Sequence, residues 1–423
     1  MSMKACFGAT LLMATGAGAG LSAEAIPVEI RQSGEGFQLF RGGQSYYVRG
    51  AGGNGSLEAL ASVGGNSVRT WGDNTVEYLD RAHAAGLSVC VGFWIEHERH
   101  GFDYNDDQAV AAEIRRHCQV IDQLKDHPAV LMWGIGNEVE LQATNPRVYD
   151  VIQAIAAHAK KVDPHHPTMT VMAMAPEKDV QEVLHRCPSI DILGCNSYGG
   201  IKVLARQIRD SGWEKAYMVT EWGNDGSWEV KTTDWGAEDE PTSMEKARQF
   251  KSRYGLIQKD AGRCLGSYAF HWGNKQETTP TWFNLFLADG SRTEMVDTLQ
   301  CLWTGSYPEM GAPQVKWLKL NNRNALSSVR VGPGQELRAS YLIGNGSPNL
   351  RAVWELLPES TDKRLGGDAE ARPGQVEISN QNQRGTCMTF QAPGKPGSYR
   401  LFFYLYGEGN SVATASFPFL VEK

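Results

Sequence analysis

Two segments of the sequence place a glutamate at the end of a short apolar run. Residues 130–140, VLMWGIGNEVE, contain Asn137 and Glu138, and residues 216–223, AYMVTEWG, contain Glu221. An apolar run bounded by glycines is typical of a strand buried on both faces, as in a parallel sheet. Polar residues at the carboxyl ends of such strands lie where these folds bind ligands. Two carboxyl groups there can act as proton donor and nucleophile, although an Asn-Glu pair can also simply cap a helix.

Alternating strand and helix patterns between residues 46 and 305 predict the scaffold that positions these glutamates, a parallel (β/α)8 TIM barrel of the α/β class. Glu138 and Glu221 then end the fourth and seventh strands. The predicted strands are residues 46–52, 67–71, 87–95, 127–138, 168–174, 190–196, 216–221 and 265–272. The predicted helices are residues 56–63, 78–85, 110–124, 148–162, 201–211, 244–261 and 295–303.

The motifs WGIGNE and VTEWG resemble the acid/base and nucleophile strands of clan A glycoside hydrolases, and the barrel resembles the catalytic domain of glycoside hydrolase family 2. The resemblance implies that Glu138 is the acid/base and Glu221 the nucleophile of a retaining double displacement. It also implies that Arg69 holds the nucleophile ionised, that Asn137 reaches the sugar 2-hydroxyl and that Tyr198 hydrogen-bonds the nucleophile. Each of these three has a structural alternative: Arg69 can form a structural ion pair, Asn137 can cap a helix, and Tyr198 can be a core residue.

The sequence departs from family 2 because that family's large N-terminal sandwich domains are missing, so its galactoside or glucuronide specificity is not carried over. A barrel followed by an all-β domain is also similar to bacterial endo-β-1,3-glucanases of the clan, and the strand-two and strand-four motifs are similar to fungal β-1,3-glucanosyltransferases. We therefore expect a β-linked oligo- or polysaccharide substrate, with β-glucan as the best candidate.

Aromatic residues at strand ends and in loops can stack on the apolar faces of sugar rings. Trp272, at the end of strand eight, and Trp228 or Trp235, in the loop after strand seven, are the principal candidates. Trp94 and His271 are further candidates, and ordinary core packing is the alternative for each of them. His97, His100, Lys275 and Glu277 are candidate contacts to sugar hydroxyls.

The predicted organisation continues beyond the barrel on both sides. Residues 1–25 have a lysine, an apolar stretch of small residues and an A-x-A ending, which predict a secretory signal peptide and an exported, periplasmic or extracellular protein. Residues 26–45 predict a β-hairpin, residues 46–305 the catalytic barrel and residues 306–313 a linker. Residues 314–423 predict an immunoglobulin-like β-sandwich, either sugar-binding or a rigid packing module.

Composition and spacing argue against several other classes of protein. The net charge of −7 is spread along the chain, so nucleic acid is not expected as a partner. No stretch after the N-terminal segment is long and apolar enough to span a membrane. Strand one carries no H-x-H pair and the cysteines no C-x-x-C pair, so no metal or other cofactor is expected. The rival functions are a transglycosylase with the same covalent intermediate and a non-catalytic saccharide-binding protein; oligomeric state is open.

Overall fold

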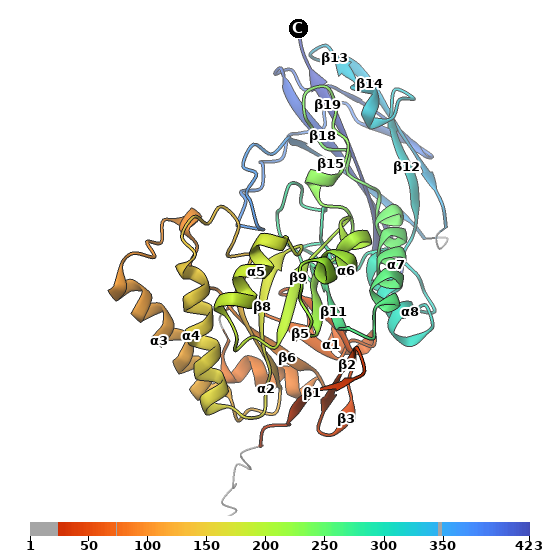
Figure 1. The fold of residues 1–423 in the computed structure, drawn as a ribbon. Helices are drawn as coiled ribbons and strands as arrows, with labels where there is room; N and C mark the ends of the chain where they lie inside the picture. The colour runs from red at the N-terminus through yellow and green to blue at the C-terminus, as the bar shows by residue number, and fades with distance from the viewer. Residues whose placement is uncertain (1–23, 73, 346–348) are drawn as a thin grey trace, which may run out of the picture.

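The computed structural model describes residues 24–72, 74–345 and 349–423. Its centre is a closed barrel of eight parallel strands in the order β10-β11-β4-β5-β6-β7-β8-β9 (Figure 1). The predicted barrel is therefore confirmed. The strands are β4 (Val48–Gly52), β5 (Ser67–Arg69), β6 (Ser88–Phe93), β7 (Val130–Asn137), β8 (Thr168–Ala173), β9 (Ile192–Asn196), β10 (Tyr217–Trp222) and β11 (Cys264–Phe270).

Helices surround the barrel and connect its strands. They are α1 (Leu57–Ser62), α2 (Val76–Ala84), α3 (Asp107–Leu124), α4 (Arg147–Val162), α5 (Glu177–Arg186), α6 (Ile201–Asp210), α7 (Ser243–Lys259) and α8 (Glu294–Thr304). Sequence reasoning missed α5. This helix is mostly polar and buries only Val180 and Val183, so its apolar stripe is narrow, although Pro176 and two acidic residues in the first turn mark its start.

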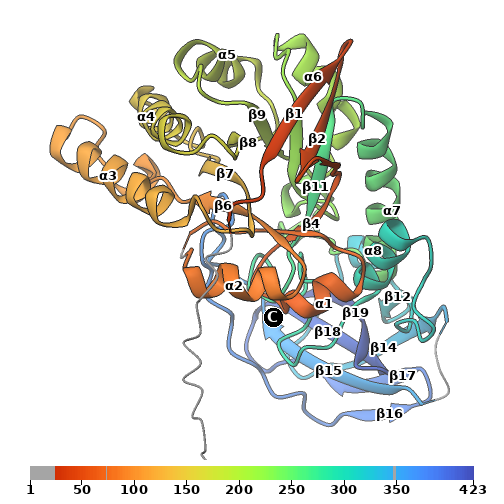
Figure 2. The same ribbon diagram turned by 90° about the horizontal axis from the view of Figure 1, so that it is seen from below.

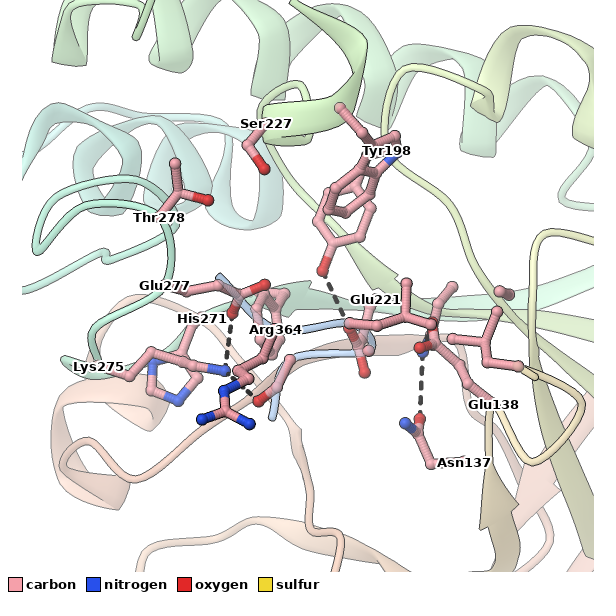
Figure 3. A pocket seen from close by; sticks show the side chains of 18 of the residues that line it. Asn137, Glu138, Tyr198, Glu221, Ser227, His271, Lys275, Glu277, Thr278 and Arg364 are labelled. Carbon is pink, nitrogen blue, oxygen red and sulfur yellow. Dashed lines mark hydrogen bonds and ion pairs between the residues drawn. The ribbon is translucent and has the colours of Figure 1, made fainter. Parts of the chain in front are cut away.

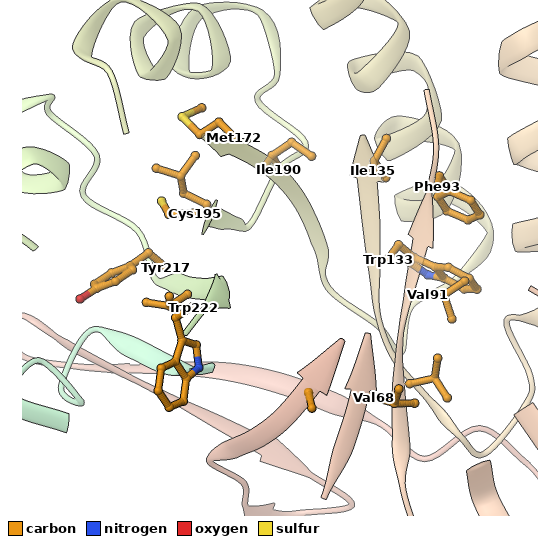
Figure 4. Packing of buried hydrophobic residues seen from close by; sticks show 14 of the residues in the cluster. Val68, Val91, Phe93, Trp133, Ile135, Met172, Ile190, Cys195, Tyr217 and Trp222 are labelled. Carbon is orange, nitrogen blue, oxygen red and sulfur yellow. The ribbon is translucent and has the colours of Figure 1, made fainter. Parts of the chain in front are cut away.

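The strand that leads to Glu138 is buried along its whole length. Every residue of β7 is buried, because one face points into the barrel and the other packs against helices. Trp133 and Ile135 belong to the large cluster between barrel and helices, where Trp133 stacks on Phe93 at 5.9 Å (Figure 4). Continuous burial explains the unbroken apolar sequence, and it holds the end of β7 in a fixed place.

A three-stranded antiparallel sheet of β1 (Val28–Ser33), β2 (Gly36–Arg41) and β3 (Gln44–Ser45) precedes the barrel (Figure 2). It is held at the amino-terminal end of the barrel strands: the amide of Val28 donates to His165 O at 2.8 Å, and that of Phe37 to Gly262 O at 2.6 Å. This sheet therefore lies at the opposite end from Glu138. The predicted signal peptide falls almost entirely on residues 1–23, outside the described residues.

The chain after the barrel forms an all-β unit of two four-stranded sheets, β12-β14-β17-β16 and β13-β19-β18-β15. Apolar residues from both sheets share one core, as in a sandwich. The strands are β12 (Val315–Leu320), β13 (Arg330–Val331), β14 (Glu336–Ile343), β15 (Arg351–Pro358), β16 (Asn382–Arg384), β17 (Cys387–Gln391), β18 (Gly397–Gly407) and β19 (Ser411–Val421). We call this unit the β-domain.

A buried polar network joins the β-domain to the barrel. Glu240, in the loop after β10, accepts hydrogen bonds from Lys246 of α7 at 2.6 Å and from Ser416 of β19 at 3.0 Å. Arg400 of β18 donates to Glu238 O at 2.8 Å and pairs with Glu359 at 3.0 Å. Because α7 also packs against β12 and β19, the two parts of the molecule are held in one arrangement (Figure 1).

Candidate active site

Glu138 and Glu221 both line one cavity of about 510 Å³ at the carboxyl ends of the barrel strands. Glu138 directly follows β7, the fourth barrel strand in chain order, and Glu221 lies near the end of β10, the seventh. Both carboxyl groups point into the cavity, with Tyr198 above Glu221 and Asn137 beside Glu138 (Figure 3). The parallel topology brings together two residues that are distant in the sequence.

Glu221 is held by three donors from the ends of two other strands, β5 and β9. Arg69 donates to Oε1 at 2.9 Å, and the Trp71 indole donates to the same oxygen at 3.3 Å. The Tyr198 hydroxyl donates to Oε2 at 2.9 Å. Burial and the neighbouring Glu221 charge raise the pKa of Tyr198, so its hydroxyl keeps its proton. The carboxylate is therefore oriented through both oxygens, and Arg69 pairs with its charge.

Glu138 has a different environment, which suits a proton donor. Its Oε1 accepts a hydrogen bond from Asn196 at 2.9 Å, and Oε2 accepts none from the described residues. Burial, followed by the nearby Glu221 charge, raises the pKa of Glu138 to about 7. Its backbone has a φ of 49°, in the left-handed region that residues other than glycine rarely adopt. The two glutamates thus differ in their hydrogen-bond partners, as an acid/base and a nucleophile must.

Asn137 does not cap a helix. Its Oδ1 accepts hydrogen bonds from Arg69 at 2.6 Å and from Asn196 at 3.1 Å, while Asn196 Oδ1 accepts from Thr220 at 2.8 Å. The network fixes Asn137 with its side chain at the cavity. Asn196 was not predicted as a site residue, because its position at the end of the sixth strand was the only indication in the sequence.

The aromatic predictions were partly correct. Trp94 and Trp228 line the cavity, and the Trp228 side chain is 67% exposed at its rim. Trp272 is fully buried and donates its indole N–H to Ser56 O at 2.9 Å, so it does not reach the cavity. Trp235 lies against Arg330 of the β-domain, also outside the cavity. Of the two alternatives in the loop after β10, the structure thus brings Trp228 to the cavity. Trp272 stays away from it because position at a strand end does not say which face a side chain takes.

In place of Trp272, its neighbours Phe270 and His271 line the cavity. Burial, with the Lys275 charge, lowers the pKa of His271 to about 3, so this imidazole is neutral and can act only through hydrogen bonds. Lys275 and Glu277 also line the cavity and form an ion pair of 2.7 Å. Of the other histidine candidates, His97 stacks on Trp94 at 4.7 Å and His100 pairs with Asp368 at 2.7 Å.

The β-domain contributes residues to the cavity, and none of these residues was predicted from the sequence. Residues 363–367 and Glu370, between β15 and β16, line it together with barrel residues. Of the two alternatives for the β-domain, sugar-binding or a rigid packing module, its place in the cavity wall is compatible with both.

Among the described residues, no group of three or more His, Cys, Asp or Glu side chains is arranged to hold a metal ion. No helix of the described residues is both long and apolar enough to cross a bilayer.

An eight-stranded parallel barrel with glutamates after its fourth strand and near the end of its seventh defines the class of clan A glycoside hydrolase barrels. Within this class, residues 78–248 match the model described as Glycosyl hydrolases family 2, TIM barrel domain. The barrel of this chain therefore resembles the family 2 TIM barrel domain over these residues, as the sequence motifs predicted.

The most similar curated relatives include β-glucuronidases. The rat (Rattus norvegicus) enzyme is 26% identical over 176 residues, covering 38% of this chain and 25% of the relative. The Paenibacillus borealis enzyme is 25% identical over 242 residues, covering 48% of this chain and 37% of the relative. The chain thus spans well under half the length of these relatives. A family 2 β-galacturonidase from Eisenbergiella tayi superposes with a TM-score of 0.51 at 16% identity, over 66% of this chain and 55% of that one, and shares the fold.

Proposed function

We propose that the protein is a retaining β-glycosidase in which Glu221 is the nucleophile and Glu138 the acid/base. The observation that carries this proposal is the unequal support of the two glutamates. Glu221 is paired with Arg69 and hydrogen-bonded by Tyr198. Glu138 has only an amide partner and a pKa raised to about 7, so about half of the molecules hold a proton on Glu138 at neutral pH that it can give up.

The reaction takes two displacements. In the first, Glu221 attacks the anomeric carbon, the glycosidic C–O bond breaks, and the proton of Glu138 passes to the leaving oxygen. In the second, Glu138, now a carboxylate, removes a proton from water while the water oxygen attacks the same carbon and releases Glu221. The β configuration is retained because the carbon is inverted twice.

A neutral sugar is the proposed substrate, with β-glucan the first candidate. Among the described residues, each lysine or arginine that lines the cavity already pairs with a carboxylate: Lys275 with Glu277, Lys363 with Glu238 and Arg364 with Asp362. A sugar carboxylate would therefore compete with existing ion pairs. A uronide is the second candidate, because the curated relatives named above are β-glucuronidases.

A substrate panel separates these candidates. We expect 4-nitrophenyl β-D-glucoside or β-1,3-, β-1,2- or β-1,4-glucan oligosaccharides to be cleaved faster than 4-nitrophenyl β-D-glucuronide. Faster cleavage of the glucuronide would assign a uronide substrate and leave the retaining mechanism intact. Product analysis in the same assays separates hydrolysis from transglycosylation, since only transfer yields products longer than the substrate.

The roles of the two glutamates are tested with azide. Glu138→Ala should slow glycosides with poor leaving groups far more than activated aryl glycosides, and added azide should yield the β-glycosyl azide. Glu221→Gly should lose activity on every substrate, and azide in the vacated space should yield the α-glycosyl azide. The same anomer from both variants, or near-native activity of Glu221→Gly, would refute the assignment and favour a protein that only binds saccharides.

Export is also part of the proposal, supported by the composition of residues 1–25. Expression of the full chain with fractionation of periplasm and medium tests it. A protein that stays in the cytoplasm and keeps residues 1–25 would overturn this part of the proposal.

A further inference from the structure

A short loop of the β-domain, residues 362–370, reaches the mouth of the barrel. We call it the capping loop. The capping loop lies between β15 and β16. Its Arg364 side chain lies at the cavity beside Lys275 (Figure 3). Its residues 363–367 and Glu370 form part of the cavity wall. No residue of the reaction described above comes from this loop.

The first anchor of the capping loop is Asp368, which binds the barrel loop after β6. Its Oδ1 pairs with Arg99 at 3.2 Å and its Oδ2 with His100 at 2.7 Å. The Arg99 side chain is only 4% exposed and that of Asp368 is 21% exposed, so this contact is a partly buried ion pair.

Three further contacts hold the loop to other barrel loops. Lys275 Nζ donates to Gly367 O at 2.9 Å, and the amide of Thr278 donates to Glu370 Oε2 at 2.6 Å; both donors follow β11. Lys363 pairs with Glu238, after β10, at 2.5 Å. The capping loop is therefore bound to the loops that follow three barrel strands, β6, β10 and β11, and these contacts define its position.

The anchored loop passes beside the reactive oxygen of Glu138. Gly366 and Gly367 have φ values of 64° and 71°, which only glycine adopts readily. A Cβ atom added to Gly366 would lie 3.4 Å from Glu138 Oε2 and 2.9 Å from Arg99 Nη2. The backbone at Gly366 therefore lies close to the one Glu138 oxygen that accepts no hydrogen bond from the described residues.

Because an acid/base delivers its proton to the leaving oxygen, the space at Glu138 Oε2 is where the leaving group must lie. We propose that the capping loop is a wall of the leaving-group subsite and limits the length of leaving group that this site accepts. The inference rests on the proposed function and adds to it a specificity determinant supplied by the β-domain. Short leaving groups fit between the loop and the barrel, while long chains meet the loop, so the enzyme acts on short saccharides and chain ends.

The test compares two substrates with the same bond and different length. The disaccharide and the hexasaccharide of β-1,3-glucan have leaving groups of the same chemistry. If the wild type prefers another linkage, the disaccharide and hexasaccharide with that linkage are used instead. The quantity measured is the ratio of kcat/KM for the hexasaccharide to that for the disaccharide. This ratio is independent of the fraction of folded enzyme, because that fraction cancels.

Two variants act on the loop and one serves as the control. Asp368→Asn releases the first anchor, and Leu365→Ala shortens an exposed side chain of the wall without touching any anchor. Asp122→Asn removes the same type of pair, with His158 at 2.8 Å, on the outside of the barrel. We expect the ratio to rise about tenfold in Asp368→Asn and about threefold in Leu365→Ala, and to stay within about twofold of wild type in the control.

The outcomes separate the two proposals. If the wild type cleaves no aryl or saccharide β-glycoside, the proposed function fails and the inference falls with it. The wild type can be active while both loop variants leave the ratio unchanged or lower kcat/KM equally for both substrates. In that case only the inference is overturned, and the capping loop is structural. A wild type that already cleaves the hexasaccharide about as fast as the disaccharide would overturn it as well.

Discussion

Arg69 donates a hydrogen bond of 2.9 Å to Oε1 of Glu221, although 152 positions separate the two residues in the sequence. A second nitrogen of the same guanidinium donates to Asn137 at 2.6 Å. One planar group therefore sets the positions of a carboxylate on the seventh strand and an amide on the fourth. A lysine ammonium has no rigid fork with which to hold both partners in fixed directions.

This relationship predicts that Arg69→Lys is not a conservative change. We expect kcat/KM to fall by about 100-fold, roughly 2.7 kcal/mol in transition-state stabilisation, because Glu221 and Asn137 lose their common support. Arg116→Lys, at a half-exposed arginine on α3, is the control and should be near wild type. Kinetics on an activated aryl glycoside measure both. A loss of less than about threefold in Arg69→Lys would show that the pairing is only structural.

The raised pKa of Glu138 predicts the pH dependence of the reaction. Glu138 must hold a proton to assist departure of the leaving group, and it loses that proton as the pH rises through about 7. The kcat/KM for a saccharide should therefore fall about tenfold per pH unit above that value. In Glu138→Ala this basic limb should vanish, because the titrating group is gone. Activated aryl glycosides need little protonation, so the variant still cleaves them fast enough to measure. A limb that persists unchanged in the variant would belong to another group.

A second buried carboxyl group predicts how stability changes with pH. Burial raises the pKa of Glu294, at the start of α8, to about 8 from an ordinary value of 4.5. Between these values the folded protein binds a proton that the unfolded chain releases, so the free energy of unfolding falls as the pH rises. The slope from this group is at most about 1.4 kcal/mol per pH unit.

Replacement of Glu294 by Gln should therefore flatten the decline in Tm between pH 5 and pH 8. The exposed Glu377, replaced in the same way, should leave the decline as it is in the wild type. Thermal unfolding followed by circular dichroism at several pH values gives both slopes. Parallel curves for Glu294→Gln and the wild type would contradict the assignment.

The buried network between barrel and β-domain predicts a large effect on stability. Lys246 is fully buried, and its Nζ donates to Glu240 at 2.6 Å and to Thr281 O at 2.8 Å. Lys246→Met leaves the Glu240 charge buried without its cation, which costs about 3–5 kcal/mol of unfolding free energy. Lys251→Met, at an exposed position of the same helix, should change it by less than about 0.5 kcal/mol. Urea unfolding of both variants measures the difference.

The mechanism predicts that activity does not depend on a metal ion, because two carboxyl groups and a hydrogen-bonded sugar supply the chemistry. Dialysis against EDTA should leave kcat/KM unchanged. Loss of activity that a single divalent ion restores would require a different mechanism.

Local patterns in the sequence determined the barrel and its two glutamates. Strands such as β7 are buried on both faces, so their sequences are unbroken apolar runs, and a catalytic group at such a strand end stands out against them. Counting alternating elements then placed Glu138 and Glu221 on the fourth and seventh strands. Arg69, Asn137 and Tyr198 were predicted by resemblance, and the structure brings all three to the pair.

Only the tertiary structure decided which neighbouring aromatic side chain faces the sugar site. Phe270, His271 and Trp272 are consecutive at the end of β11, and the first two line the cavity while the third packs behind it. A shift of one residue in this irregular segment changes which side chain points inward. Sequence position cannot resolve that choice, because all three are compatible with burial.

The capping loop could not be found from the sequence at all. Asp368 and its partner Arg99 are 269 positions apart and belong to different parts of the chain. The residues around Asp368 are polar and rich in glycine, as in an ordinary surface loop, so nothing local distinguishes them. Their place beside Glu138 follows from how the β-domain docks on the barrel, through the buried Glu240, Lys246 and Arg400. Docking depends on contacts among distant residues, and local sequence patterns do not encode those contacts.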